Sequence, residues 1–296
     1  MSLILDHIVI AVHDLEPAIA DYAALGFNVL RGGEHPGRST HNALVVFADG
    51  SYFELIAWRE PAPQERWWQL LQAHGEGLVD FALLPQDTAT TVREAGQRGL
   101  QLLGPLDGGR VRPDGERLHW QTARAPSPDL PFLCGDLTPR VLRVPEGDAR
   151  VHPNGAQGVA SLAIAVHDLE ASLERYRALL GDKATVGQPV TLPGGDIHLA
   201  VVNLGASALL LTAPRHAVGH PARPLAQRLG TRGQGPSGLV LRTADAGQRS
   251  GPLDLARTHG ALLEFELAES EFLNKSASSP REIGAGRSQN GSAVGG

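Results

Sequence analysis

Two ionisable residues interrupt apolar runs near the start of the chain. His7 breaks the run from Leu3 to Val12, and Glu54 breaks a second run from Ser51 to Trp58. Apolar runs of this length predict buried strands. Burying a carboxylate costs several kcal/mol unless a partner compensates it. A histidine and a glutamate that face one cavity therefore indicate either a divalent metal site or a proton-transfer pair.

The residues after the first run predict a helix that packs on the strand containing His7. Asp14 stands where a helix N-cap belongs. Leu15, Ile19 and Tyr22 then recur with helical spacing, and Gly26 is typical of the residue that follows a helix. The first 58 residues thus predict one βαβββ unit.

The dipeptide Asp-Gly at 49–50 predicts a two-residue hairpin turn between the last two strands of this unit. In that register Glu54 pairs with Val45, and His41 lies opposite Trp58. Alternation along the strands then gives the lining of a predicted pocket, which consists of His7, His41, Tyr52, Glu54 and Trp58.

The unit resembles one module of the vicinal oxygen chelate superfamily, which includes glyoxalase I, bleomycin-resistance proteins and extradiol dioxygenases. The stretches DHIVIAV (6–12), HPGRSTHNAL (35–44) and YFELIAW (52–58) are most similar to glyoxalase-like proteins of uncharacterised activity. Members of the superfamily pair two βαβββ modules into a half-open barrel. They commonly hold a metal with a residue of the first strand and a glutamate of the last, so the resemblance implies His7 and Glu54 as metal ligands.

A second βαβββ unit is predicted at 77–135, with Asp80 in the place of His7. The resemblance implies Asp80 as a third ligand or as a residue that orients one, and pairing with an arginine is the alternative. The last strand of this unit has no glutamate, and Cys134 stands near that place. The implied cofactor is a divalent ion (Mn, Fe, Ni, Zn or Mg). An oxygen-rich ligand set favours Mn²⁺, Fe²⁺ or Mg²⁺.

The heptapeptide IAVHDLE occurs twice, at 10–16 and at 164–170. An identity of this length in matching strand-to-helix contexts indicates an internal repeat. Aligning the repeats puts Ser161 in the place of His7 and Leu210 in the place of Glu54. A fourth, shorter unit is predicted at 238–267. The second half of the chain is therefore expected to lack metal ligands.

These units predict an α+β fold in which βαβββ modules pair into two half-open, glyoxalase-like barrels. We expect the first domain, with the candidate site, at 1–140, and a Pro/Gly-rich linker at 141–157. The second domain is expected at 158–269. The Ser/Gly-rich residues 270–296 have too few large apolar side chains to form a core and are predicted to be a disordered tail.

Composition excludes several classes of function. The net charge of the 296-residue chain is −6 without a basic cluster, which argues against a nucleic-acid surface. No apolar run reaches the roughly 20 residues of a membrane helix, and the first residues lack the basic region of a signal peptide. Cys134 is the only cysteine, so an intrachain disulfide is impossible, which suits the cytoplasm. Whether modules pair within one chain or in a homodimer stays open.

The leading hypothesis is a metal-dependent lyase, isomerase or dioxygenase that acts on a small carbonyl- or vicinal-oxygen-containing molecule. Glu54 would be a ligand and a general base, and His41, Tyr52 and Trp58 would contact the substrate. The alternative is a metal-free protein that binds a small molecule, as in bleomycin resistance. In the plainest interpretation, His7 is a hydrogen-bonded core histidine and the aromatic residues only pack the core.

Overall fold

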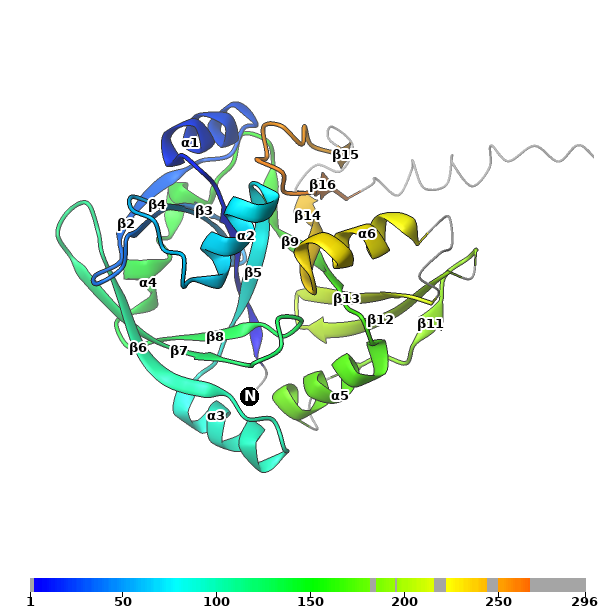
Figure 1. The fold of residues 1–296 in the computed structure, drawn as a ribbon. Coiled ribbons are helices and arrows are strands. Elements are labelled where there is room, and N and C mark those ends of the chain that lie inside the picture. Colours follow the sequence, from blue (N-terminus) through cyan, green and yellow to red (C-terminus); the bar gives the residue numbers. More distant parts are fainter. Residues whose placement is uncertain (1–2, 182–184, 195, 216–221, 244–249, 267–296) are drawn as a thin grey trace, which may run out of the picture.

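The computed structural model describes residues 3–181, 185–194, 196–215, 222–243 and 250–266. Two β-sheets lie next to each other, and helices cover their outer faces (Figure 1). This confirms the α+β fold with glyoxalase-like units. The predicted tail at 270–296 lies outside the described residues.

The first sheet closes into an eight-stranded barrel in the order β1-β4-β3-β2-β6-β7-β8-β5. One pair of residues, Glu34 and Val111, joins β2 to β6 and completes the ring. The strands are β1 Ile4–Ala11, β2 Leu30–Glu34, β3 Thr40–Val46, β4 Tyr52–Trp58, β5 Gly77–Leu84, β6 Leu103–Val111, β7 Arg117–Arg124 and β8 Phe132–Asp136.

The predicted helix after the first strand is present as α1, Leu15–Ala24. The Asp14 side chain caps it by accepting a hydrogen bond from the backbone N–H of Glu16. Gly26 follows with φ 86°, a conformation that suits glycine. The other helices near the barrel are α2 Arg66–His74, α3 Thr88–Gln97, α4 Arg140–Arg143 and the 3₁₀ helix Gly147–Arg150.

The second sheet is open, with the order β10-β12-β13-β9-β14-β16-β15 and β11 beside β12. Its strands are β9 Ala156–Ala165, β10 Thr185–Val186, β11 Val190–Thr191, β12 Ile197–Leu204, β13 Ser207–Pro214, β14 Gly235–Thr243, β15 Gly251–Pro252 and β16 Leu263–Phe265. Its helices are α5 Leu169–Leu180 and α6 Arg223–Arg232. In the predicted fourth unit, residues 255–260 between β14 and β16 form turns, and the described part of that segment contains no helix. No helix in the described ranges is long and apolar enough to cross a membrane.

The strand registers place the two copies of the heptapeptide in equivalent surroundings. In the barrel, His7 lies opposite Tyr52 on parallel strands β1 and β4. In the second sheet, Ser161 lies opposite Ala208 on parallel strands β9 and β13. The alignment of Ser161 with His7 therefore holds in three dimensions, and the second sheet has no histidine at that point.

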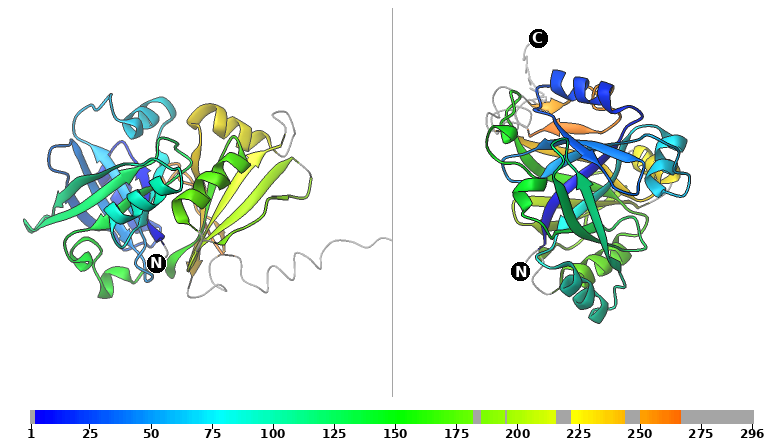
Figure 2. Two further views of the ribbon diagram at one scale, coloured as in Figure 1. Left: turned by 90° about the horizontal axis from the view of Figure 1, so that it is seen from below. Right: turned by 90° about the vertical axis from the view of Figure 1, so that its left-hand side faces the viewer.

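The barrel and the second sheet lie side by side (Figure 2). They share one continuous hydrophobic core. Its buried residues run from Leu3 in the barrel to Phe265 in the second sheet. Polar contacts cross the same boundary: the Tyr22 hydroxyl donates to the carbonyl of Thr258 at 3.1 Å. The two sheets thus pack as one body within a single chain.

Candidate functional site

The hairpin that carries Glu54 has a longer turn than the sequence predicts. Residues 47–51 form the connection, and Glu54 pairs with Leu44 instead of Val45. This shift by one residue places His41 opposite Ala57 and turns it away from the cavity. The prediction that His41 lines the pocket is therefore wrong.

Asn42 takes the place on the wall that His41 was expected to fill. Its Nδ2 donates a hydrogen bond to Oε1 of Glu54 at 2.6 Å. Gly32 on β2 leaves room for the amide of Asn42, because a Cβ there would lie 2.0 Å from Oδ1. The register change thus replaces an imidazole by a hydrogen-bonded amide beside the buried carboxylate.

His7 and Glu54 meet inside the barrel, as the sequence predicts. Nε2 of His7 lies 3.6 Å from Oε2 of Glu54, and both side chains are buried. Burial raises the pKa of the Glu54 carboxyl, but His7, His35, Asn42 and Arg110 outweigh it and hold this pKa below its ordinary value. Glu54 is therefore a buried carboxylate at neutral pH.

A second imidazole, which the sequence argument missed, flanks the other oxygen of Glu54. Nε2 of His35 lies 3.6 Å from Oε1 of Glu54, and Nδ1 lies 2.9 Å from Oγ1 of Thr40. Burial lowers the pKa of His35 below 6.5, so this ring is neutral at pH 7. His35 follows β2 and belongs to the stretch 35–44, which carries part of the family resemblance. Asn42 lies in the same stretch, and this closeness in sequence was the signal that could have identified His35 as a site residue.

A bulge in β1 brings Asp6 next to His7. The pairing of β1 with β5 shifts between Leu5 and His7, so Leu5 joins the outer core with Ile8. Asp6 Oδ2 then lies 2.7 Å from Nδ1 of His7. Strict alternation, which puts Leu5 and His7 on the same face, is wrong at this point.

Asp6 belongs to a buried cluster of two carboxylates and two guanidinium groups. Nη1 of Arg143 lies 2.8 Å from Asp6 Oδ2, and Nη1 of Arg140 lies 2.7 Å from Oδ1. Arg143 also pairs with Asp136 and donates to the Tyr52 hydroxyl at 2.8 Å. Burial raises the pKa of Asp6, but chiefly the charge of Arg143 outweighs it and holds this pKa far below its ordinary value. Asp6 is therefore ionised and accepts hydrogen bonds only.

The two arginines of this cluster come from the segment after the barrel's last strand. Both lie on the short helix α4, and Arg143 is almost fully buried. Residues 141–157, which the composition predicts as a linker, thus supply part of the support beneath His7.

Asp80 is engaged away from Glu54, so its predicted role as a metal ligand is not supported by its contacts. One of its oxygens accepts hydrogen bonds from Trp67 Nε1 and Arg124 Nη1, each at 2.8 Å. Arg66 Nη1 adds a longer contact at 3.3 Å. Asp80 pairs with arginines, as the alternative interpretation expects. Two of its partners, Trp67 and Arg124, line the cavity.

The two aromatic residues predicted to contact a substrate differ in position. Tyr52 lines the cavity and stacks on the His7 ring, with centroids 4.7 Å apart. Trp58 packs against Trp68 outside the cavity lining, and its Nε1 donates to Glu65 at 2.9 Å. The interpretation of Trp58 as core packing is the one its contacts support.

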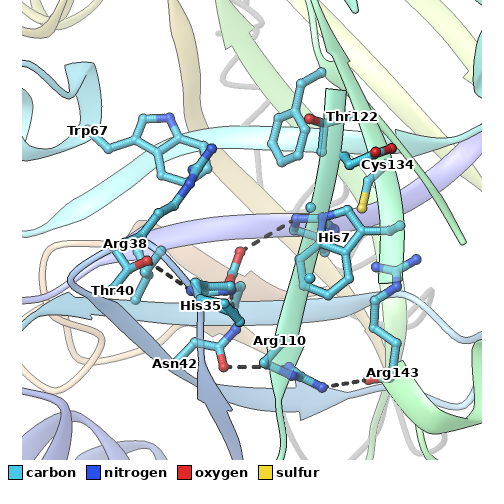
Figure 3. Close-up of a pocket in the computed structure, with 18 of the residues that line it drawn as sticks. His7, His35, Arg38, Thr40, Asn42, Trp67, Arg110, Thr122, Cys134 and Arg143 are labelled. Carbon is cyan, nitrogen blue, oxygen red and sulfur yellow. Dashed lines mark hydrogen bonds and ion pairs between the residues drawn. The ribbon is translucent and has the colours of Figure 1, made fainter. Parts of the chain in front are cut away.

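The cavity in front of Glu54 has a volume of about 140 Å³, which suits a small molecule (Figure 3). Arg38, Trp67, Arg124 and Cys134 are among the residues that line it. Burial raises the pKa of the Cys134 thiol to about 12, so the thiol stays protonated. The other residues that line the cavity include His7, His35, Thr40, Asn42, Tyr52, Gly108, Gly109, Arg110, Trp120, Thr122, Phe132 and Arg143.

A metal ion needs several His, Cys, Asp or Glu donors around one point. Within the ranges that the structure describes, no three His, Cys, Asp or Glu side chains are placed to hold one ion. The nearest set is Glu54 with His7 and His35, whose Nε2 atoms lie 3.6 Å from its Oε2 and Oε1. Asp80, the implied third ligand, is bound by arginines. The observed arrangement does not fit the metal site that the resemblance implies.

A buried histidine–carboxylate pair inside a barrel of βαβββ units defines a protein of the glyoxalase-like class. The family model of the glyoxalase-like domain matches residues 5–180, and the chain belongs to this family. No curated protein matches the sequence.

Solved structures share the fold at low sequence identity. A hypothetical protein from Staphylococcus aureus has a TM-score of 0.66 and 12% identity, over 90% of this chain and 100% of that one. A mutant of 4-hydroxymandelate synthase from Streptomyces coelicolor has a TM-score of 0.59 and 15% identity, over 82% and 72%. A xylose isomerase-like TIM barrel/4-hydroxyphenylpyruvate dioxygenase fusion protein has a TM-score of 0.57 and 15% identity, and the match covers 96% of this chain but 43% of that one.

Proposed function

We propose that the barrel is an enzyme site that moves a proton on a small carbonyl-containing molecule, with Glu54 as the base. The observation that carries this proposal is a buried, ionised carboxylate between two imidazoles at a cavity. A general base must be ionised and must reach the substrate, and its strength falls as its pKa falls. Glu54 meets both requirements, since it is ionised and lines the cavity.

His7 is the second proton-transfer group. Because ionised Asp6 only accepts hydrogen bonds, the proton between them belongs to Nδ1 of His7. Nε2 then accepts a proton when the ring carries only the Nδ1 proton, and it can give one to the substrate carbonyl when the ring carries both protons. A carboxylate that fixes the tautomer of a catalytic imidazole recurs in unrelated enzymes.

Aromatic side chains exclude water from the reacting groups. Tyr52 stacks on His7, Phe132 meets the same ring edge-on at 5.3 Å, and Trp120 meets His35 edge-on at 6.1 Å. A dry site strengthens the electrostatic interactions between a substrate and these groups. The proposed reaction is therefore of the lyase or isomerase type, and no step is assigned to a metal.

The test is exchange of carbon-bound protons with D₂O, followed by ¹H NMR on a panel of acidic and neutral carbonyl compounds. We expect exchange by the wild type and a fall of roughly 10²- to 10⁴-fold in Glu54→Gln. Glu34→Gln is the matched control, since Glu34 forms an exposed ion pair with Arg59. Equal rates in wild type and Glu54→Gln would refute the assignment.

Elemental analysis of the same preparations adds an independent readout. Near-stoichiometric metal in the wild type that is lost in Glu54→Gln would replace the proton-transfer assignment by the metal-dependent one.

A binding protein without catalysis is the second candidate. It is favoured by the aromatic walls and by the fact that both oxygens of Glu54 already have partners. Saturable binding of a panel member, without proton exchange in any protein, would support it.

A further inference from the structure

Arg110 is a buried cation without a carboxylate partner. It lies on β6 with an exposed fraction of 4%. Within the described ranges no carboxylate lies within 4.0 Å of it, and its Nε has no hydrogen-bond partner. Its two remaining contacts are long and go to neutral oxygens, those of Asn42 at 3.5 Å and of the Arg143 backbone at 3.3 Å.

Such a group is costly in a folded protein. An arginine stays charged in proteins, and an uncompensated buried charge destabilises by several kcal/mol. The other buried guanidinium of the cavity, Arg143, is matched by Asp6 and Asp136. Arg110 is thus the one cavity-lining guanidinium, among the described residues, that is buried yet unmatched by a carboxylate. Arg110 lines the cavity, and its Nε is buried without a hydrogen-bond partner.

The amide of Asn42 fixes how far this cation lies from the base. Its nitrogen donates to Glu54, and its oxygen faces Nη1 of Arg110 (Figure 3). One amide group therefore bridges Arg110 and Glu54, through contacts of 3.5 Å and 2.6 Å. An anion on Arg110 would place the next one or two atoms of the same molecule beside Glu54.

We infer that Arg110 binds the carboxylate of a short 2-oxygenated carboxylic acid, whose carbonyl and adjacent carbon lie at Glu54 and His7. Arg fits a planar carboxylate through two parallel hydrogen bonds. Arg38, an exposed residue of the cavity lining without an ion-pair partner among the described residues, would attract such anions to the cavity. The inference rests on the proposed function, since it names the substrate class of the same site.

The experiment compares pyruvate with 2,3-butanedione, in which a neutral acetyl group replaces the carboxylate. Both carry methyl protons next to a carbonyl. Binding is measured by calorimetry, and exchange of the methyl protons with D₂O by NMR. In exchange, Glu54 takes the proton as the C–H bond breaks, and the electron pair of that bond moves into the carbonyl as an enolate. Glu54 exchanges this proton with D₂O and returns a deuteron to the carbon, which forms the C–D bond and restores the carbonyl.

We expect wild type to bind pyruvate at least 10-fold more tightly than 2,3-butanedione, and Arg110→Gln to lose this preference. Arg110→Lys keeps the charge but not the paired donors, so it should retain only part of the preference. Arg117→Gln, an exposed change on β7, is the matched control. Thermal unfolding of each variant confirms that it is folded.

The outcomes separate the two proposals. Exchange that depends on Glu54 but is equal for both probes would overturn the carboxylate anchor and leave the proposed function standing. Binding of pyruvate that depends on Arg110, without exchange of either probe, would keep the anchor and overturn proton transfer. No pyruvate binding at millimolar concentration, or binding that is unchanged in Arg110→Gln, would overturn the anchor.

Discussion

Asp6 determines which nitrogen of His7 can act on a ligand. Its carboxylate is held between Arg143 and Arg140, and its remaining contact is Nδ1 of His7. A hydrogen bond to a fixed anion orients the ring and selects one tautomer. Asp6 is therefore a positioning residue that acts through His7.

Asp6→Asn should lower proton exchange by roughly 10²-fold while leaving ligand affinity nearly unchanged. The amide can donate to Nδ1 and thereby favour the wrong tautomer of His7. The measurement is the exchange rate at saturating probe, together with the dissociation constant. A parallel loss of affinity and rate would indicate collapse of the site instead.

Asp6 also predicts a dependence of stability on pH. Because folding lowers its pKa, its contribution is present above the unfolded value of about 4 and is lost as pH falls further. In urea unfolding, the free energy of unfolding of the wild type should exceed that of Asp6→Asn. This difference should be constant from pH 8 to pH 5 and shrink toward pH 2. An unchanged gap across this range would contradict the shift.

Among the elements, β2 approaches the side chains of β3 and β6 closely at Gly32. A Cβ at this position would lie 2.0 Å from Oδ1 of Asn42 and 2.9 Å from Nη1 of Arg110. The bulge between Arg31 and Gly33 accompanies this contact. A glycine is needed here for space, because the two side chains that flank Glu54 occupy it.

Gly32→Ala should destabilise the fold by about 1–3 kcal/mol and break the Asn42–Glu54 hydrogen bond. Gly230→Ala is the control, since Gly230 lies in α6 with nothing within 4 Å of its added Cβ. That change should be neutral or stabilise by up to about 1 kcal/mol. Urea denaturation measures both, and equal effects would contradict the packing argument.

Elements with regular patterns could be predicted from the sequence. The helix between the Asp14 cap and Gly26 is present as predicted, because caps and apolar periodicity are local signals. The meeting of His7 with Glu54 followed from module geometry. These features depend on residues close together in the chain.

Features that depend on register or on distant segments could not be predicted. The turn is longer than the Asp-Gly dipeptide predicts, and the resulting shift moved His41 off the cavity wall. A bulge in β1 brought Asp6 beside His7. Arg110 and Arg143 come from regions with no strong pattern of their own, and only tertiary packing brings them to the cavity. One-residue shifts reverse the face of every side chain in a strand.

For the molecule as a whole, the shared core predicts that barrel and second sheet unfold together. All four tryptophans, at positions 58, 67, 68 and 120, belong to the barrel half. Tryptophan fluorescence therefore reports on that half alone, whereas far-UV circular dichroism reports on both. The two urea curves should coincide with one midpoint. Separate midpoints would show that the core between the sheets adds little to their stability.

The sulfur of Cys134 gives the cavity a property that no other part of the chain has. It is the only thiol, it sits in the cavity wall, and burial keeps it protonated. Alkylating reagents attack thiolates, so the folded closed form should be inert toward them. The labelling rate then counts how often the barrel opens. A small molecule that occupies the cavity would slow the alkylation of Cys134. The native cysteine can therefore serve as a probe for the binding of ligands that have no optical signal.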